Sequence, residues 1–530
     1  MPKHFNIAGP CREGDHYMLP PEARMTELRP LIEEKAYFVV HAPRQTGKTT
    51  TLTSLARSLT AEGHFAAVLT SCKVGEAAGN DIELAVQAII EVLAVKAQQQ
   101  LPEELRPDPA ALRDSAVGPV RLLRYLNNWC NRCPRPVVLF LDEVDALVDE
   151  TLLSVLEQLH AGYDDRPNGF PHAVALIGLR DVRDYKIRRG HRQTAGTSSP
   201  FNIKLTSLRL RDFDQEEVAE LYAQHTDATG QPFSNDAVKS AFELTRGQPW
   251  LVNALARQIV TQEAPDRQET VEPRHFDAAK EALILRRDTH LDSLVDRLRE
   301  DRVRAVVEPI LAGVALSGDV LNDDFAFVRD LGLVRPGPRG LEIANPIYRE
   351  IVPRILTSMM ELSIVLPRSS YLDMEGRLDV DQLLLDFRAF WLANAEVYLR
   401  QTPYSEAAAQ LILMAFLHKA INGQGGLIDR EYAAGRGRLD LCIRWPQPSG
   451  EVLRWALELK VWRDNTPTGP GTPDPVEQGL VQLNEYLERL GLDRGYLIVF
   501  DARSDAVPLP ARVSCEEREV AGRAITLWQL

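Results

Sequence analysis

Cysteine is scarce in this sequence: there are 6 cysteines among 530 residues. A chain of this length can bury enough apolar surface to fold without disulfides, so no disulfide framework is expected. Cys130 and Cys133 form a Cys-x-x-Cys pair, but no second cysteine or histidine pair accompanies it to complete the four ligands of a structural zinc site. We interpret both as packing residues, with a zinc or redox role as the alternative.

Long hydrophobic runs are also lacking. Residues 1–30 contain acidic residues, arginine and proline throughout, so they do not have the apolar core of a signal peptide. The richest apolar stretch, 407–421, is interrupted by Gln410, His418 and Lys419 and is too short to span a bilayer. The sequence therefore predicts a cytoplasmic protein that makes no membrane contact.

Basic charge does not dominate the composition. The chain has 61 Lys and Arg against 75 Asp and Glu, a formal net charge of −14. This balance argues against a surface covered with positive charge for indiscriminate nucleic-acid binding, so any such contact must be local. Hydrophobic residues make up 45% and charged residues 26%, as in ordinary soluble proteins. The length favours three or four domains.

Short apolar segments alternate with helical patterns in the first two hundred residues or so. Strands are predicted at 36–41, 64–71, 136–141 and 173–179. Helices are predicted at 48–59, 82–95 and 119–129. Short buried strands alternating with helices predict a parallel sheet that is covered on both faces.

The strand pattern ends at about residue 207, and the composition changes again near residue 366. A helical lid is predicted from helices at 213–225, 235–244 and 249–263. A winged helix is predicted from helices at 302–316 and 324–331 and a hairpin at 333–344. The C-terminal part is predicted to contain helices at 380–399, 405–421 and 475–490 and strands at 438–445, 453–462 and 495–500.

A phosphate-binding loop is predicted at Ala42-Pro43-Arg44-Gln45-Thr46-Gly47-Lys48-Thr49, followed by Thr50, between the first strand and the first helix. Such a loop needs converging backbone N–H groups, a helix N-terminus, a lysine for the outer phosphates and a hydroxyl for magnesium. Gly47, Lys48 and Thr49 supply these groups. Ala42 stands where a glycine is usual, and alanine is the smallest replacement. The expected cofactors are ATP and Mg²⁺.

Two acidic residues follow the apolar strand at 136–141. We expect Asp142 to hold the magnesium shell and Glu143 to orient or deprotonate the attacking water. The pair thus predicts hydrolysis of ATP as well as binding. The alternative is two surface acids that follow a core strand.

The N-terminal segments resemble the bacterial AAA-like ATPases related to the STAND and archaeal ATPase groups. The resemblance covers roughly residues 1–356 and rests on the phosphate-binding loop and the motifs Phe5-Asn6-Ile7-Ala8-Gly9-Pro10, His16-Tyr17-Met18, Gly178-Leu179-Arg180-Asp181 and Ser199-Pro200-Phe201-Asn202-Ile203. It implies an ASCE-type sheet in which Arg180 is the sensor arginine. Gly247-Gln248-Pro249 resembles the GxP motif of the lid, which implies that Pro249 contributes to the nucleotide site. His16 and Tyr17 either cover the adenine or pack the N-terminal segment.

A second group of candidate residues lies in the C-terminal part. Strand alternation along 453–462 places Glu458 and Lys460 on one face, and pairing of this strand with 438–445 brings Asp440 toward Glu458. Two carboxylates suit a hard divalent metal, and a lysine beside them can position water or a phosphate. The group predicts metal-assisted phosphodiester cleavage.

These residues resemble the PD-(D/E)XK nuclease superfamily, whose motif matches Asp440, Glu458 and Lys460, although Leu439 stands before Asp440 instead of proline. The resemblance implies a restriction-endonuclease-like α/β fold and a site for Mg²⁺ or Mn²⁺ that also uses the carbonyl of Leu459. It further implies supporting roles for three residues on helices: Glu406, Gln482 and Tyr486.

The whole chain is thus predicted to be an α/β multidomain protein. Its predicted domains are a P-loop ATPase domain of ASCE, AAA-like type (1–206), a helical lid (207–290), a winged helix (291–365) and a restriction-endonuclease-like domain (366–530). The predicted function is an ATP-driven switch that controls a nuclease, with defence against foreign DNA as the setting that the architecture suggests. The alternative is an ATP-regulated DNA-binding or signalling protein whose nuclease-like domain is inactive. Expected partners are ATP and nucleic acid, DNA first, with a second copy of the chain as a further candidate.

Overall fold

The computed structural model forms two compact units. It describes residues 2–113, 118–179, 204–286, 294, 296–311, 316, 323–338, 340–353, 364–368, 370–401, 408–421, 425–434, 437–447, 449–462, 474–503 and 505–530. The first unit comprises Met1–Leu294, Gly318–Pro336 and Ala344–Pro346, and the second comprises Val295–Ser317, Gly337–Ile343 and Ile347–Leu530. Within the described ranges, no helix has both the length and the apolar character of a membrane span. The boundaries of the four domains that the sequence predicts stay a prediction.

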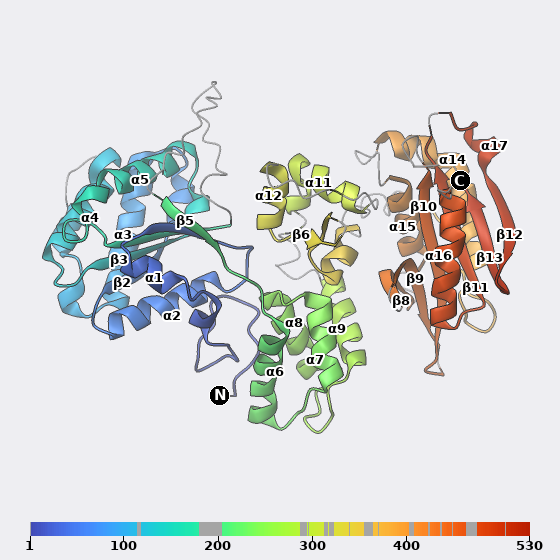
Figure 1. Cartoon of the computed structure of the whole chain (residues 1–530), viewed down its shortest axis with the longest axis horizontal. Coiled ribbons are helices and arrows are strands. Elements are labelled where there is room, and N and C mark those ends of the chain that lie inside the picture. Colours follow the sequence, from blue (N-terminus) through green and yellow to red (C-terminus); the bar gives the residue numbers. More distant parts are fainter. Residues whose placement is uncertain are drawn as a thin grey trace. The chain divides into compact units, whose positions relative to one another are not determined.

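A five-stranded parallel sheet of order β2-β3-β4-β1-β5 organises the first unit (Figure 1). Its strands are β1 (Tyr37–His41), β2 (Ala66–Ser71), β3 (Val137–Asp142), β4 (Ala173–Gly178) and β5 (Lys204–Arg209). The first four confirm the predicted strands. The sequence analysis did not assign β5, because this edge strand mixes polar and apolar residues and pairs only with β1.

Helices cover both faces of this sheet (Figure 1). One face packs against α1 (Leu28–Glu33) and α2 (Lys48–Ala61), and the other against α3 (Ile82–Gln100), α4 (Gly118–Arg132) and α5 (Asp149–Ala161). Successive strand residues such as Leu139 and Phe140 point to opposite faces and are both fully buried. Each such side chain contributes roughly 1.5–3 kcal/mol through burial.

Cys130 and Cys133 lie at the end of α4. Cys130 belongs to the core between the sheet and α3, α4 and α5, and Cys133 packs against that core. The Cys133 thiol donates to the carbonyl oxygen of Leu105, and both cysteines are free thiols. Their surroundings are those of packing residues.

Four helices follow the sheet: three lie where the sequence predicts helices, and the sequence analysis did not assign the fourth. They are α6 (Gln215–Thr229), α7 (Asn235–Thr245), α8 (Pro249–Gln258) and α9 (Pro273–Arg286), and α8 continues into a π-helical turn at Ile259–Glu263. That this region acts as a lid stays a prediction. The side chains of Asp214, Ser234 and Gln248 cap the first three by accepting a backbone N–H of the first turn.

Gly247, immediately before the cap of α8, is expected to tolerate no side chain. Its φ is 79°, and a Cβ there would lie 1.8 Å from the carbonyl oxygen of Phe213, whose N–H donates to Gly247. Gly247→Ala should therefore lower the free energy of unfolding by about 3 kcal/mol or more. Gly230→Ala is the control, because φ is 81° there but no atom lies within 4 Å of the added Cβ, so about 1 kcal/mol is expected. Urea unfolding of both variants measures the difference, and equal losses would contradict the steric argument.

Two helices and a hairpin follow the lid in the predicted order. They are α11 (Asp301–Leu311), α12 (Asp323–Asp330) and a two-stranded sheet of β6 (Val334–Gly337) and β7 (Gly340–Ile343). This order agrees with the sequence pattern. Identification as a winged helix stays a prediction.

The second unit contains a six-stranded mixed sheet of order β12-β13-β11-β10-β9-β8 (Figure 1). Its strands are β8 (Leu427–Ala434), β9 (Gly437–Pro446), β10 (Val452–Trp462), β11 (Arg494–Asp501), β12 (Ser514–Val520) and β13 (Arg523–Gln529). Its helices are α14 (Val380–Gln401), α15 (Ala408–Ile421), α16 (Pro475–Leu490) and α17 (Leu509–Arg512). The sequence analysis assigned β9, β10 and β11 but not β8, β12 or β13. Strand β12 shows no apolar face, because six of its seven residues are exposed at the sheet edge.

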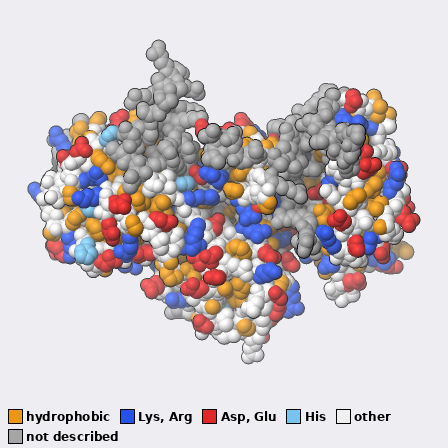
Figure 2. All heavy atoms as spheres, in the orientation of Figure 1, with side chains coloured by type: hydrophobic (Ala, Val, Ile, Leu, Met, Phe, Trp, Pro, Cys, Tyr) orange, Lys and Arg blue, Asp and Glu red, His pale blue; other side chains and the backbone are white. Residues whose placement is uncertain are grey.

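Charges of both signs are interspersed among the described residues on the face that Figure 2 displays. Figure 2 shows Lys and Arg beside Asp and Glu over the coloured parts of the face it displays, without a broad field of positive charge among the described residues. This agrees with the net charge of −14.

Candidate functional site

The phosphate-binding loop connects the end of β1 to the start of α2. Gln45 and Gly47 have left-handed backbones, with φ of 59° and 95°. Ala42 is fully buried and is not among the residues with positive φ, so its backbone does not require the glycine that is usual there. The loop therefore forms despite the substitution.

Lys48 and Thr49 open α2 and turn toward the loop and the neighbouring strand. The Lys48 ammonium donates to the carbonyl oxygens of Ala42 (2.6 Å) and Pro43 (2.7 Å). Burial lowers the pKa of Lys48 to about 8, although the nearby Asp142 carboxylate opposes that shift. The Thr49 hydroxyl donates to Asp142 Oδ2 at 2.7 Å. The structure thus brings together the predicted lysine, hydroxyl and carboxylate.

Asp142 ends β3 and is 6% exposed. Burial raises its pKa, and the hydrogen bond from Thr49 acts in the opposite direction. Hydroxyl and carboxylate oxygens are the ligands that Mg²⁺ prefers, so Thr49 and Asp142 fit the predicted metal.

Glu143 follows with a left-handed backbone (φ 56°) and is held by a residue that the sequence analysis missed. The hydroxyl of Ser71 donates to Glu143 Oε2 at 2.6 Å. Ser71 ends β2, and the parallel register pairs it with Asp142. Its position at the carboxyl end of the neighbouring strand was the signal that could have revealed it.

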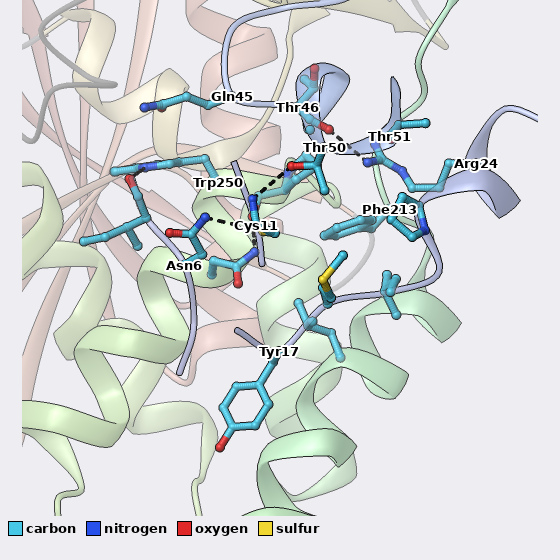
Figure 3. Close-up of a pocket in the computed structure, with 18 of the residues that line it drawn as sticks. Asn6, Cys11, Tyr17, Arg24, Gln45, Thr46, Thr50, Thr51, Phe213 and Trp250 are labelled. Carbon is cyan, nitrogen blue, oxygen red and sulfur yellow. Dashed lines mark hydrogen bonds between the residues drawn. The ribbon is translucent and has the colours of Figure 1, made fainter. Parts of the chain in front are cut away.

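A pocket adjoins the loop (Figure 3). Its walls come from the N-terminal segment, which includes Ile7, from loop residues Gly47 and Thr50, and from lid residues Pro249 and Trp250. The space that these residues surround is about 710 Å³, and this volume includes open solvent at the mouth of the pocket. Predicted residue Pro249 therefore lies at the site.

Hydrogen bonds tie the three walls of the pocket together. The backbone N–H of Cys11 donates to Thr50 Oγ1 at 3.0 Å, and the Trp250 indole N–H donates to the carbonyl of Ile7 at 2.9 Å. Figure 3 shows Thr50 between Trp250 and the ring of Phe213. The sequence analysis missed Trp250 and Phe213, because their role depends on contacts between distant segments.

Arg24 connects the phosphate-binding loop to the segment that precedes α6. Its guanidinium donates to the carbonyl of Thr46 at 2.9 Å and to that of Arg211, and lies 4.7 Å from the ring centre of Phe213. Burial lowers the pKa of Arg24 to about 10. Arg24 was also missed by the sequence analysis.

The two N-terminal candidates differ in position. Tyr17 lines the pocket, but its ring extends away from the labelled loop residues (Figure 3) and packs against Phe5 and His225. His16 is not part of the pocket wall and accepts the backbone N–H of Arg12 at 2.8 Å. Both residues mainly pack the N-terminal segment.

Arg180, the predicted sensor arginine, lies outside the described residues, just after the end of β4. Its role stays a prediction.

Asp440, Glu458 and Lys460 lie together in the second unit. The register pairs Leu441 with Leu457, so Asp440 and Glu458 occupy the next opposed positions of β9 and β10. Asp440 Oδ2 accepts the backbone N–H of Leu459 at 2.8 Å, and the Lys460 ammonium donates to Glu458 Oε1 at 2.6 Å.

Glu458 is the most buried of the three, with 2% exposure. Burial and the nearby Asp440 carboxylate raise the pKa of Glu458 to about 7. Its Oε2 is buried without a hydrogen-bond partner among the described residues. A divalent cation would satisfy this orphaned oxygen, so these residues fit the predicted metal. The described residues contain no group of three or more His, Cys, Asp or Glu suited to a metal.

Three residues are predicted to support this site, and two of them lie on α16. Strand alternation places Glu458 on the same face of β10 as Ala456, and Ala456 packs against Leu483 of α16. Helix α16 therefore covers the face of the sheet that carries Glu458. On α16, Gln482 is exposed and Tyr486 is half-buried against the core beneath the helix. Glu406 lies outside the described residues.

One family model and several solved structures are similar to this chain. Residues 32–185 match a family model described as an AAA domain. Among solved structures, the Walker-type ATPase PABY2304 of Pyrococcus abyssi is 14% identical with a TM-score of 0.46, and the match covers 66% of this chain and 99% of that one. The RuvB Holliday junction branch migration motor of Thermotoga maritima is 14% identical (TM-score 0.33, 62% and 93% covered), and Cdc6p of Pyrobaculum aerophilum is 13% identical (TM-score 0.34, 66% and 96% covered). No curated protein matches the chain.

Proposed function

We propose that this chain, which contains an AAA-type P-loop ATPase domain at residues 32–185, uses ATP hydrolysis to control a metal-dependent nuclease domain of PD-(D/E)XK type. The observation that carries the nuclease part is the grouping of Asp440, Glu458 and Lys460 on two paired strands. Nucleic acid, DNA in the first place, is the proposed substrate, and defence against foreign DNA is the proposed setting. The ATPase domain is then the control element of the protein.

In the ATPase half, the chain's own residues have distinct roles. The loop N–H groups and Lys48 bind the phosphates, and Thr49 and Asp142 would hold Mg²⁺, which neutralises phosphate charge when it is bound. Glu143 orients or deprotonates the attacking water. Arg180 is proposed as the sensor by resemblance alone.

The hydrogen bond between Ser71 and Glu143 predicts restrained hydrolysis. The Ser71 hydroxyl, 2.6 Å from Glu143 Oε2, competes with the attacking water for this carboxylate oxygen. Ser71→Ala should therefore raise basal ATP turnover by about threefold to tenfold, the range that a net hydrogen-bond energy of ~0.5–1.5 kcal/mol allows. Ser58→Ala, on the exposed side of α2, is the control. The rate of steady-state phosphate release measures ATP turnover in both variants. Reduced turnover in Ser71→Ala would contradict the expectation and make Ser71 a residue that positions Glu143.

In the nuclease half, Asp440, Glu458 and the carbonyl of Leu459 would hold Mg²⁺ or Mn²⁺. The metal supplies an activated water and neutralises developing charge when bound. Lys460 positions water or the scissile phosphate, because its ammonium lies beside Glu458. Gln482 is exposed on α16 and available to contact the nucleic-acid backbone, whereas Tyr486 supports that helix.

Control requires that the nucleotide bind one conformation more tightly than another. The walls of the pocket include two elements that a nucleotide can contact together, because Pro249 and Trp250 belong to the predicted lid while Thr50 follows the phosphate-binding loop. A nucleotide in this pocket touches both elements at once. Its binding and hydrolysis therefore change the free energy of lid closure.

A second candidate function is an ATP-regulated DNA-binding or signalling protein with an inactive nuclease-like domain. It is favoured by the lack of a third acidic, histidine or cysteine ligand near Asp440 and Glu458 among the described residues. Incubation of the full chain with DNA and Mg²⁺ or Mn²⁺, with and without ATP, separates the two functions. Metal-dependent cleavage supports the nuclease, and its absence under every condition supports the second candidate.

A further inference from the structure

One polar side chain in the pocket beside the phosphate-binding loop has unused hydrogen-bonding capacity. Asn253 of α8 lines this pocket and is 8% exposed. Its Nδ2 donates to the carbonyl oxygen of Pro249 at 2.8 Å, one turn earlier in the helix. Its Oδ1 is buried and has no hydrogen-bond partner in the part of the chain that the structure describes. A buried acceptor is costly unless a ligand satisfies it.

Chemistry fixes the orientation of the Asn253 amide. The Pro249 carbonyl can only accept a hydrogen bond, so the amide nitrogen must face it. The oxygen is then the atom left without a partner, on a side chain that lines the pocket. Asn253 therefore offers a ligand an acceptor and no donor.

The pocket suits a flat base attached to a phosphate chain. It begins at Gly47 and Thr50 of the phosphate-binding loop, and its walls include Pro249, Trp250 and Phe213. Aromatic and proline surfaces pack against heteroaromatic rings. The few polar groups of such a pocket determine which base is accepted.

We propose that Asn253 Oδ1 accepts a hydrogen bond from the exocyclic amino group of adenine and thereby selects ATP over GTP. The inference rests on the proposed function, in which the loop binds ATP. Guanine carries a carbonyl oxygen in place of the adenine amino group, so two acceptors would face each other. A site built around a specific hydrogen bond rejects such a ligand strongly.

The first test uses the unaltered full chain and three nucleotides. Equilibrium binding with Mg²⁺ is measured for ATP, for GTP and for purine riboside triphosphate, which has hydrogen in place of the amino group. ATP should bind about tenfold more tightly than the purine analogue, as one buried hydrogen bond allows, and GTP should bind most weakly. Equal affinity for ATP and the purine analogue would overturn the inference.

The second test compares a variant of Asn253 with a control variant elsewhere in the full chain. Asn253→Leu removes the amide at similar volume and should weaken ATP binding about tenfold, to the level of the purine analogue, whose affinity should not change. Asn235→Leu, at an exposed position of α7, is the matched control and should change neither affinity.

The outcomes separate this inference from the proposed function. If Asn253→Leu weakens ATP and the purine analogue equally, Asn253 is only structural and the inference fails while ATP binding stands. If the unaltered chain binds none of the three nucleotides, the proposed ATP function fails and the inference fails with it. If Asn253→Leu does not fold, the comparison of ATP with the purine analogue in the unaltered chain decides.

Discussion

Glu143→Gln is expected to lower ATP turnover by about 10²–10⁴-fold, the usual contribution of a general base, while ATP affinity is retained. The amide cannot accept a proton from water, but it is nearly the same size as the carboxylate. Ser71 can still donate to the amide oxygen, so the local structure should persist. Phosphate release and equilibrium binding of ATP, measured on the same preparation, test both halves of this expectation.

Lys48→Ala supplies the contrast, because Lys48 would contact the phosphates directly. ATP affinity itself should fall in this variant, and turnover should fall with it. Lys239→Ala, an exposed lysine of the lid, is the matched control and should alter neither quantity. ATP binding that is undiminished in Lys48→Ala would contradict the role of the loop. Full turnover in Glu143→Gln would remove Glu143 from the chemistry but leave the loop in place.

The ATP site was largely predictable because its chemistry is encoded in short contiguous segments. The loop before Lys48 and the acid pair after β3 each combine a motif with a strand that ends at the same sheet edge. Parallel strands bring those ends together whatever the details of packing, so Thr49 and Asp142 meet at 2.7 Å. A different local rule brings Asp440 and Glu458 together, because the register of the antiparallel strands β9 and β10 places these two residues opposite each other.

The rest of the site depends on contacts between distant segments. Trp250 and Ile7 are 243 residues apart, and Arg24 and Arg211 are 187 apart, yet each pair is joined by a hydrogen bond. Neither pair is marked by a local pattern. Strands β5 and β12 escaped prediction for a related reason, because edge strands need not bury both faces and so lack a continuous apolar run.

Asp440→Asn should abolish metal-dependent cleavage of DNA, with a loss of at least about 10²-fold if the chain is a nuclease. The substitution removes one of two negative charges that would bind the cation. It preserves an oxygen that can accept the Leu459 N–H, now 2.8 Å from Asp440 Oδ2, so the strand pairing should be kept. The cleavage assay with Mg²⁺ or Mn²⁺ and a fluorescent DNA measures the effect directly.

Glu519→Gln is the matched control, because Glu519 is an exposed carboxylate on the edge strand β12 of the same sheet. Cleavage should be unchanged in this variant. Cleavage that survives Asp440→Asn but depends on metal would place the active residues elsewhere, or identify a contaminating nuclease.

Comparison of Asp440→Asn with Lys48→Ala then tests whether the ATPase domain and the nuclease domain are coupled. Loss of ATP binding should change cleavage only if the ATPase domain controls the nuclease. A nuclease that responds to Asp440→Asn but not to Lys48→Ala or added ATP would be an independent domain, and the switch would be excluded.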